Sequence, residues 1–281
     1  MTILLKNGHV VDYVNGFEGK KDILIKDGFI RALGDNLECN DKNARVVDCN
    51  GLTVIPGICD MHVHLRDPGQ TYKEDIITGC EAAVAGGVTA LACTKPPVDN
   101  KETVKYILDK AKKAKAKVYP VGCITKGMQG KELCDYDELK AAGCVAVSDD
   151  GRPVESANMM AQAMVKAHYA GLKVISHCED LEIIDGGIIN KGKISQQLGV
   201  KGMSRLSEDI ITARELAIAQ DTQMPIHIAH VSTKGSVNTI RGNTHIGVMC
   251  TCETAPHYFM MTDEKLLSRD ADYRMNPPLR E

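Results

Sequence analysis

The fold of this chain is decided by the stretch Asp60-Met61-His62-Val63-His64-Leu65-Arg66-Asp67-Pro68-Gly69. The stretch follows an apolar run from Leu52 to Cys59, whose β-branched residues are typical of a fully buried strand. Residues two apart on a strand face the same side, so His62 and His64 present two imidazoles together at the end of this strand. The spacing is typical of a metal-ligand pair, although two unrelated histidines can also produce it.

The composition allows one large domain and one small one. The chain has 281 residues, of which 43% are hydrophobic, and a net charge of −3. This balance gives no reason to expect binding to nucleic acid or to an anionic membrane. The first residues lack the features of a signal peptide, and no apolar run is long enough to span a bilayer. We therefore expect a cytoplasmic protein.

The chain contains eleven cysteines, an odd number that does not favour a disulfide framework. Most of them lie in apolar, strand-like runs, where cysteine serves as a small hydrophobic residue. Cys250 and Cys252 form a C-x-C on one such run, and we interpret them as packing residues rather than zinc ligands.

Residues 1–56 are predicted to form a small β-sandwich domain. Short apolar runs alternate there with turn residues, among them Gly8 and Asn50-Gly51. The expected strands cover residues 3–5, 9–11, 22–25, 29–33 and 45–48. A module of this size carries little core, so we expect it to pack against other parts of the chain or to borrow strands.

Residues 57–281 are predicted to form a metal-dependent (β/α) barrel. Buried strands alternate with helical patterns, which favours a parallel sheet and a (β/α)8 barrel of the TIM type. The expected strands are Val54–Asp60, Val88–Cys93, Lys117–Ile124, Cys144–Ser148, Lys173–Ser176, Pro225–Ala229 and Ile246–Thr251. The expected helices are Lys73–Ala85, Lys101–Lys115, Asp135–Ala141, Ser156–Ala170, Ser207–Asp221 and Ser232–Arg241. Because this pattern has seven strands rather than eight, the barrel is expected to be incomplete.

Metal-ligating side chains follow four of the expected strands. They are His62 and His64 after the first, Asp149 and Asp150 after the fourth, His177 after the fifth and His230 after the sixth. In such barrels the active site lies at the carboxyl ends of the strands, so we expect these side chains to meet. One histidine pair would hold a first ion, the other pair a second, and one carboxylate would bridge them; such ligands favour two zinc ions. Water activated by both ions makes this a hydrolytic site.

The chain resembles the dihydroorotase branch of the amidohydrolase superfamily, of the long bacterial type, from Met1 to Glu281. The motifs that carry the resemblance are the stretch 60–69, His177-Cys178-Glu179-Asp180, His230-Val231-Ser232-Thr233-Lys234, Pro256-His257 and Asn276-Pro277-Pro278-Leu279-Arg280. The resemblance implies a reversible cyclisation of N-carbamoyl-L-aspartate to L-dihydroorotate, a step of pyrimidine biosynthesis.

The resemblance also implies roles for single residues. Asp150, rather than Asp149, would bridge the ions, and Arg66 and Asn276 would bind the substrate carboxylate, which suits the planar guanidinium group. The fourth strand offers no lysine, whereas related hydantoinases and allantoinases use a carboxylated lysine as the bridge.

Four further residues near these strand ends have weaker expectations. His257 is a candidate for orienting a metal ligand. Glu179 and Asp180 either orient His177 or are simply solvated. His227, on the strand before His230, is expected to face away from that ligand.

The sequence departs from the family in two places. A Met-Pro-Asn string that supplies one substrate contact in relatives is missing, and Lys95 or Asn100 is a candidate replacement. The chain also ends at Glu281, before the eighth strand whose Asp binds the first ion and moves protons in the family. The resemblance therefore predicts a poorly active fragment of a longer protein, or a barrel completed by another chain.

Two other functions stay open at this point. The chain could be an inactive scaffold that holds a carbamoyltransferase, as the two departures suggest, or another cyclic amidohydrolase such as an allantoinase or hydantoinase. A homodimer is expected from the resemblance alone.

Overall fold

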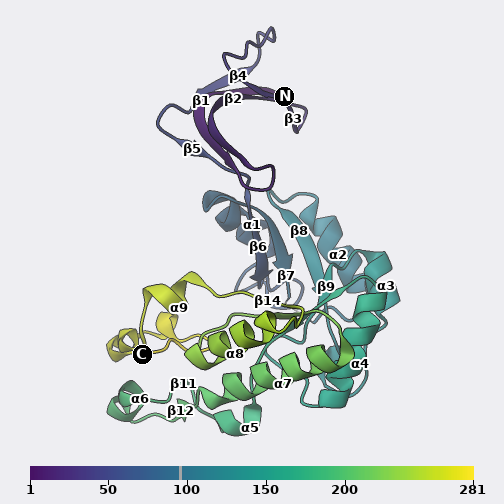
Figure 1. Ribbon diagram of the computed structural model, residues 1–281, viewed down its shortest axis with the longest axis vertical. Helices are drawn as coiled ribbons and strands as arrows, with labels where there is room; N and C mark the ends of the chain where they lie inside the picture. The colour runs from purple at the N-terminus through teal and green to yellow at the C-terminus, as the bar shows by residue number, and fades with distance from the viewer. Residues whose placement is uncertain (95–96) are drawn as a thin grey trace. The chain divides into compact units, whose positions relative to one another are not determined.

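The computed structural model describes the whole chain except residues 95–96, and Figure 1 labels its helices and strands. It divides into two compact units, Met1–Ile58 and Cys59–Glu281. The division lies two residues beyond the boundary expected between residues 56 and 57. None of the helices in the described part of the chain is both long and apolar enough to cross a membrane.

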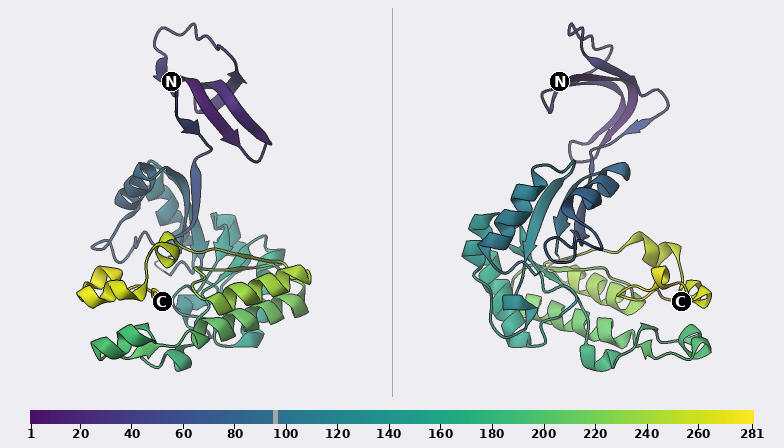
Figure 2. Two further views of the ribbon diagram at one scale, coloured as in Figure 1. Left: turned by 60° about the vertical axis from the view of Figure 1, so that its left-hand side comes forward. Right: turned by 180° about the vertical axis from the view of Figure 1, so that it is seen from behind.

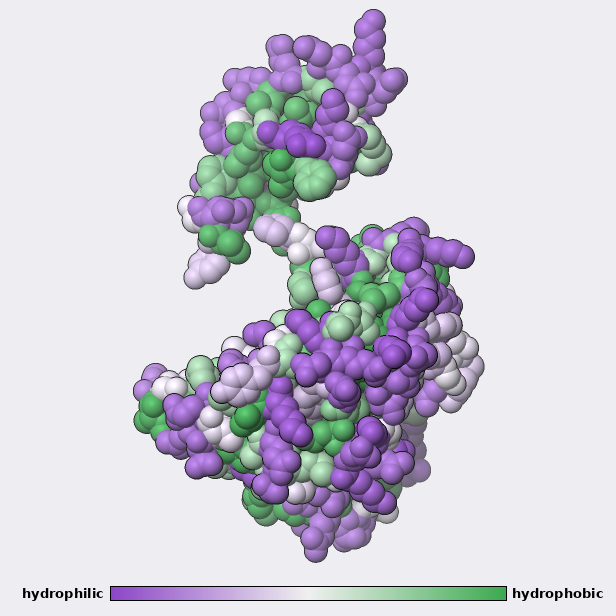
Figure 3. All heavy atoms as spheres, turned by 90° about the vertical axis from the view of Figure 1, so that its right-hand side faces the viewer, coloured by the Kyte–Doolittle hydropathy of each residue, from purple (hydrophilic) through white to green (hydrophobic). Residues whose placement is uncertain are grey.

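The N-terminal unit is built from one sheet of five strands. The strands are β1 (Thr2–Asp12), β2 (Phe17–Lys26), β3 (Phe29–Gly34), β4 (Arg45–Asp48) and β5 (Thr53–Val54). Strands β1, β2 and β3 are antiparallel neighbours, whereas β4 and β5 run parallel to β1. Several large hydrophobic side chains remain exposed on this unit, including Phe29, Ile30 and Val46. Figure 3 shows green, hydrophobic residues at the surface of this unit. The unit is the separate strand domain that the sequence predicted, and it has little core of its own.

The expected turn at Gly8 is wrong, because Gly8 lies inside β1. The register of β1 against β2 shifts between Leu5 and Gly8. A Cβ atom at Gly8 would lie 2.7 Å from Val54 Cγ2, so a glycine there lets β5 approach β1 closely. This glycine marks a close strand contact rather than a chain reversal.

The apolar run before His62 is not the single buried strand that was expected. Thr53–Val54 pairs with β1, and a new strand, β6 (Ile58–Val63), begins after an irregular segment that contains Pro56. Ile55 is 55% exposed and Ile58 is 48% exposed. The physical reason is that proline lacks a backbone donor and that β6 lies at the edge of its sheet in the described chain.

The larger unit is a curled parallel sheet of seven strands in the order β14-β13-β10-β9-β8-β7-β6. After β6 come β7 (Val88–Cys93), β8 (Lys117–Gly122), β9 (Ala146–Val147), β10 (Lys173–Ser176), β13 (Ile226–Ile228) and β14 (Cys250–Cys252). The main helices are α1 (Ile76–Ala85), α2 (Lys101–Ala111), α3 (Tyr136–Ala142), α4 (Ala157–Tyr169), α7 (Leu206–Thr222) and α8 (Lys234–His245). Figure 2 shows these helices outside the curve of the sheet. The incomplete (β/α) barrel predicted from the sequence is therefore confirmed.

The fourth and the seventh expected strands are shorter than predicted. The run Ile246–Thr251 begins as the end of α8, because Ile246 caps that helix and Gly247 turns the chain with a φ of +93°. Strand β14 therefore starts only at Cys250. Likewise, only Ala146 and Val147 of the expected fourth strand pair with neighbours.

A small subdomain between β10 and α7 has no counterpart in the sequence predictions. It contains α5 (Leu181–Ile184), β11 (Ile189–Asn190), α6 (Lys193–Leu198) and β12 (Gly202–Met203). Ile189, Ile194 and Leu266 form its core, and Asn190 donates a hydrogen bond to Asp263 at 3.0 Å. The last segment of the chain, with α9 (Pro256–Met260) and short 3₁₀ helices, thereby packs against the subdomain.

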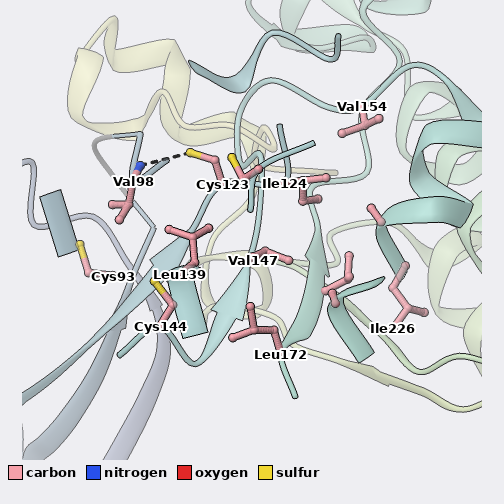
Figure 4. Packing of buried hydrophobic residues seen from close by; sticks show 14 of the residues in the cluster. Cys93, Val98, Cys123, Ile124, Leu139, Cys144, Val147, Val154, Leu172 and Ile226 are labelled. Atoms are coloured by element: carbon pink, nitrogen blue, oxygen red, sulfur yellow. Dashed lines mark hydrogen bonds between the residues drawn. The ribbon is translucent and has the colours of Figure 1, made fainter. Parts of the chain in front are cut away.

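The main core lies between the sheet and its helices (Figure 4). Cys93, Cys123 and Cys144 are buried there, and the Val98 backbone N–H donates to Cys123 Sγ at 3.1 Å. These free thiols pack as small hydrophobic groups, as predicted.

Leu139 tests this packing, because its side chain is fully buried on α3. We expect Leu139→Ala to lower the free energy of unfolding by about 2–5 kcal/mol, since it removes buried surface and leaves a cavity. The matched change Leu267→Ala, at a 42% exposed position, should cost less than about 1 kcal/mol. Urea unfolding followed by circular dichroism measures both, and equal costs would contradict the assigned core.

Candidate metal centre

Four parallel strands bring five possible metal ligands to one edge of the sheet. His62 and His64 come from the end of β6, and Asp150, His177 and His230 follow β9, β10 and β13. The side chains form two groups, His62–His64–Asp150 and Asp150–His177–His230, and within each the ligand atoms lie within 4.8 Å of one another. The structure therefore brings together all five residues singled out from the sequence, and Asp150 belongs to both groups.

The carboxylate of Asp150 is the centre of this arrangement. Its Oδ1 lies 3.4 Å from His62 Nε2, 3.3 Å from His177 Nδ1 and 3.4 Å from His230 Nε2. Its Oδ2 lies 3.3 Å from His64 Nε2. A carboxylate that faces imidazoles of both groups has the placement required of a bridging ligand.

The charges at the site are strongly coupled. Burial alone would raise the pKa of Asp150, but hydrogen bonds from His177, His230 and His62 outweigh it and hold that pKa well below its usual range. Burial opposes the charged form of His62, yet the carboxylates of Asp150 and Glu253 raise its pKa to about 10. The pKa of His177 is raised to about 9 by the same balance, with Asp150 and Glu179 as its partners. A cation bound here would have to displace protons from these imidazoles.

The donor set fits a divalent cation. His62 Nε2 is buried and lies 3.4 Å from Asp150 Oδ1. His177 Nδ1 and His230 Nε2 lie only 2.7 Å apart, so both ring nitrogens point into the same small space beside Asp150. Imidazole and carboxylate donors without thiolate suit zinc or a similar ion, and neither group includes Cys250 or Cys252.

Glu253 contacts the ring nitrogen of His62 that does not face Asp150. The sequence analysis did not identify this residue. Its Oε1 lies 2.6 Å from His62 Nδ1, and its Oε2 lies 3.3 Å from His227 Nε2. His227 Nδ1 in turn lies 2.8 Å from Thr251 Oγ1. The expectation that His227 faces away from His230 stays a prediction, and His227 is linked to His62 through Glu253. Glu253 directly follows β14, so the strand-end rule that selected the other ligands could have found it.

Glu179 supports His177 in the same way. Its Oε2 lies 3.0 Å from His177 Nε2, the ring nitrogen that does not face Asp150. Burial would raise the pKa of Glu179, but hydrogen bonds with His177 and Asn276 lower it. Asp180 has a different task, since its side chain caps α5 by accepting from the Ile183 N–H. Of the two acidic residues left open by the sequence, Glu179 is the one that contacts His177, and Asp180 does not share that contact.

Asp149 has a structural role. Its Oδ1 accepts hydrogen bonds from the backbone N–H groups of Ile124, at 2.7 Å, and Thr125, at 3.1 Å. It thus ties the end of β8 to the end of β9 and leaves Asp150 to face the imidazoles.

The remaining candidates are distributed around the centre. Asn276 lines a small pocket that also includes His177 and Glu179. Arg66 is half-buried and has a left-handed backbone with a φ of +59°.

Asn100 and His257 both make local contacts. Asn100 is occupied as the N-cap of α2, where it accepts from the Thr103 N–H, and Lys95 lies outside the described residues. His257 packs against Tyr258, with ring centroids 4.2 Å apart.

Comparisons with known proteins agree with this geometry. A family model described as "Dihydro-orotase-like" matches residues 51–236. The chain is 49% identical to a dihydroorotase of Trichlorobacter lovleyi and 50% identical to one of Geobacter sulfurreducens, each alignment covering 100% of the chain and 67% of the relative. The chain therefore spans about two thirds of the length of these curated relatives.

Solved structures with the same fold include hydantoinases. An L-hydantoinase from Arthrobacter aurescens superimposes with a TM-score of 0.82 at 20% identity, covering 99% of this chain and 64% of that one. A D-hydantoinase gives a TM-score of 0.81 at 26% identity, with coverages of 100% and 64%.

Glu253→Gln tests the support of His62. The substitution keeps the shape but removes the charge that holds the His62 imidazole, so we expect zinc affinity at the His62–His64 group to fall by about 10–100-fold. Titration against a zinc chelator measures the affinity, and Glu264→Gln, at an exposed position, is the matched control. Unchanged affinity in Glu253→Gln would show that Glu253 does not orient the ligand.

Proposed function

Because this chain belongs to the dihydroorotase-like family of cyclic amidohydrolases, we propose that it carries most of the active site of a dihydroorotase. The reaction would be the reversible cyclisation of N-carbamoyl-L-aspartate to L-dihydroorotate. The observation that carries the proposal is the pair of histidine groups sharing Asp150 at the carboxyl ends of parallel strands. Whole-chain identity of 49–50% to dihydroorotases supports the choice of this reaction over others in the superfamily.

The proposed cofactor is a pair of zinc ions. His62 and His64 would hold one ion, His177 and His230 the other, and Asp150 both. Such ions lower the pKa of water and polarise a carbonyl group. The protein's own contribution would be to orient the imidazoles, because the carboxylates of Glu253 and Glu179 contact ring nitrogens of His62 and His177.

Arg66 and Asn276 are proposed to bind the substrate carboxylate. A guanidinium group donates two parallel hydrogen bonds to a carboxylate, which fixes both its position and its angle. Asn276 lines the same pocket as the ligand His177, so a group bound there lies next to the metal centre. Together they would place the reacting amide of the ring over the ions.

Both alternatives left open by the sequence are less well supported. A scaffold has no need of five candidate ligands with two supporting carboxylates. The group shared by both histidine sets is Asp150 rather than a lysine, which favours the dihydroorotase branch over hydantoinases and allantoinases. The homodimer, the carbamoyltransferase partner, the cytoplasmic location and the weak activity of residues 1–281 alone stay predictions.

Asp150→Asn in the full-length protein tests the proposal. Losing the shared charge should lower bound zinc and reduce kcat/KM for dihydroorotate hydrolysis by about 10²–10⁴-fold. Asp221→Asn, an exposed change at the end of α7, is the control. Zinc analysis and absorbance assays in both directions measure the effects.

Three results would contradict the proposal. A zinc-loaded full-length protein with no turnover would indicate the scaffold function. Faster turnover of hydantoin or allantoin than of dihydroorotate would indicate another cyclic amidohydrolase. A full-length protein that binds no metal would exclude the proposed metal site.

Arg66→Met tests the carboxylate contact. We expect KM for dihydroorotate to rise by about 10–100-fold, since hydrogen bonds to a charged group are lost, while zinc content stays unchanged. Arg66→Lys should not restore the parent KM, because an ammonium group cannot form the bidentate contact. A KM within twofold of the parent value in Arg66→Met would exclude the role.

A further inference from the structure

We propose that Asp67, held from α2 by Tyr106 and Lys110, is a positioning group that fixes Arg66 and thereby sets the affinity for carboxylate-bearing substrates. The inference rests on the proposed function insofar as Arg66 binds the substrate. The structural claim, that Asp67, Tyr106 and Lys110 determine the backbone conformation of Arg66, rests on their contacts and does not depend on the proposed function.

Arg66 has a conformation that must be imposed by its surroundings. Its φ of +59° lies in the left-handed region, which residues with a Cβ atom avoid and keep only where neighbouring contacts require it. Its carbonyl accepts a hydrogen bond from the Gln70 N–H at 2.8 Å, which closes the loop locally. That bond alone does not anchor the loop to the barrel, so the fixed points must lie on either side of Arg66.

Leu65 is the first fixed point. It is 3% exposed, and its backbone N–H donates to Cys93 Sγ on β7 at 3.5 Å. A Cβ atom at Gly79 would lie 2.5 Å from Leu65 Cδ2, so glycine in α1 leaves the space that this side chain fills. Leu65 is thus locked between the sheet and α1.

Asp67 is the second fixed point, and it is fully buried. Its Oδ1 accepts from Tyr106 Oη at 2.9 Å, and its Oδ2 accepts from Lys110 Nζ and, at 3.4 Å, from the Ile76 N–H. Lys110 also lies 3.3 Å from Oδ2 of Asp75, the residue that caps α1. The carboxylate is therefore bound to α1 and α2 at once.

The anchoring of the loop gives a reason for burying the charged carboxylate of Asp67. A buried ion pair contributes little net stability compared with apolar packing, but it specifies one geometry. An arginine side chain loses rotational entropy when it binds a ligand, and a fixed backbone reduces the number of conformations that must be given up. Asp67 follows Arg66 directly, so its anchoring acts on the backbone that carries the guanidinium group.

The test uses the zinc-loaded, full-length protein and the variants Lys110→Met and Tyr106→Phe. We expect each to raise KM for dihydroorotate, Lys110→Met by about tenfold, with kcat changed less than twofold and zinc content unchanged. In the Arg66→Met background, Lys110→Met should raise KM no further, because the residue it positions is gone. Lys112→Met, at the exposed C-terminal end of α2, is the matched control for Lys110→Met. Tyr169→Phe, at the exposed end of α4, is the matched control for Tyr106→Phe.

A crystal structure of Lys110→Met provides the readout that does not depend on the reaction. Loss of the left-handed conformation at Arg66, or a displaced 65–70 loop, is expected. An unchanged loop would overturn the inference, as would equal increases of KM in the presence and absence of Arg66. If the parent protein neither turns over dihydroorotate nor binds orotate by calorimetry, the proposed function fails, while the crystal structure still decides the role of Asp67.

Discussion

The structure depends on one buried carboxylate. Asp150 is 4% exposed and lies 3.3–3.4 Å from a nitrogen of each of four imidazoles, which three other parallel strands deliver. Its negative charge is tolerated only because protonated imidazoles or bound cations compensate for it. This requirement ties the register of the whole sheet to the site, since a shift of any of these strands would leave a buried charge unpaired.

A second layer of carboxylates keeps this centre in place. Glu253 and Glu179 hold the outer nitrogens of two ligands, and Glu208 on α7 fixes the loop after His230 by accepting from the backbone N–H groups of Ser232, at 2.9 Å, and Thr233, at 3.0 Å. Arg280 joins the same network, 3.2 Å from Glu208. The ligands therefore sit on strand ends, while residues from helices and from the last segment of the chain restrain them.

The errors of the sequence predictions share a physical cause. A hydrophobic run predicts a strand, but hydrophobicity alone does not say which neighbour the segment will meet. The run before His62 divides between two sheets at Pro56, and Ile246–Met249 completes a helix end. The glycine at position 8 allows a close approach of β5, which no local pattern distinguishes from a turn.

By itself, the sequence determined the alternation of strands and helices, the parallel sheet and the set of five candidate ligands, because residue spacing within one strand fixes which side chains share a face and parallel strands end at one edge. Its likeness to a known family supplied the choice of Asp150 over Asp149. Only the tertiary structure decided that Glu253 and His227 stand behind His62, and that Asp67 meets Tyr106 and Lys110. His62 and Glu253 are 191 residues apart in the sequence, and Asp67 and Tyr106 are 39 apart. Such contacts follow from the packing of whole elements rather than from any local pattern.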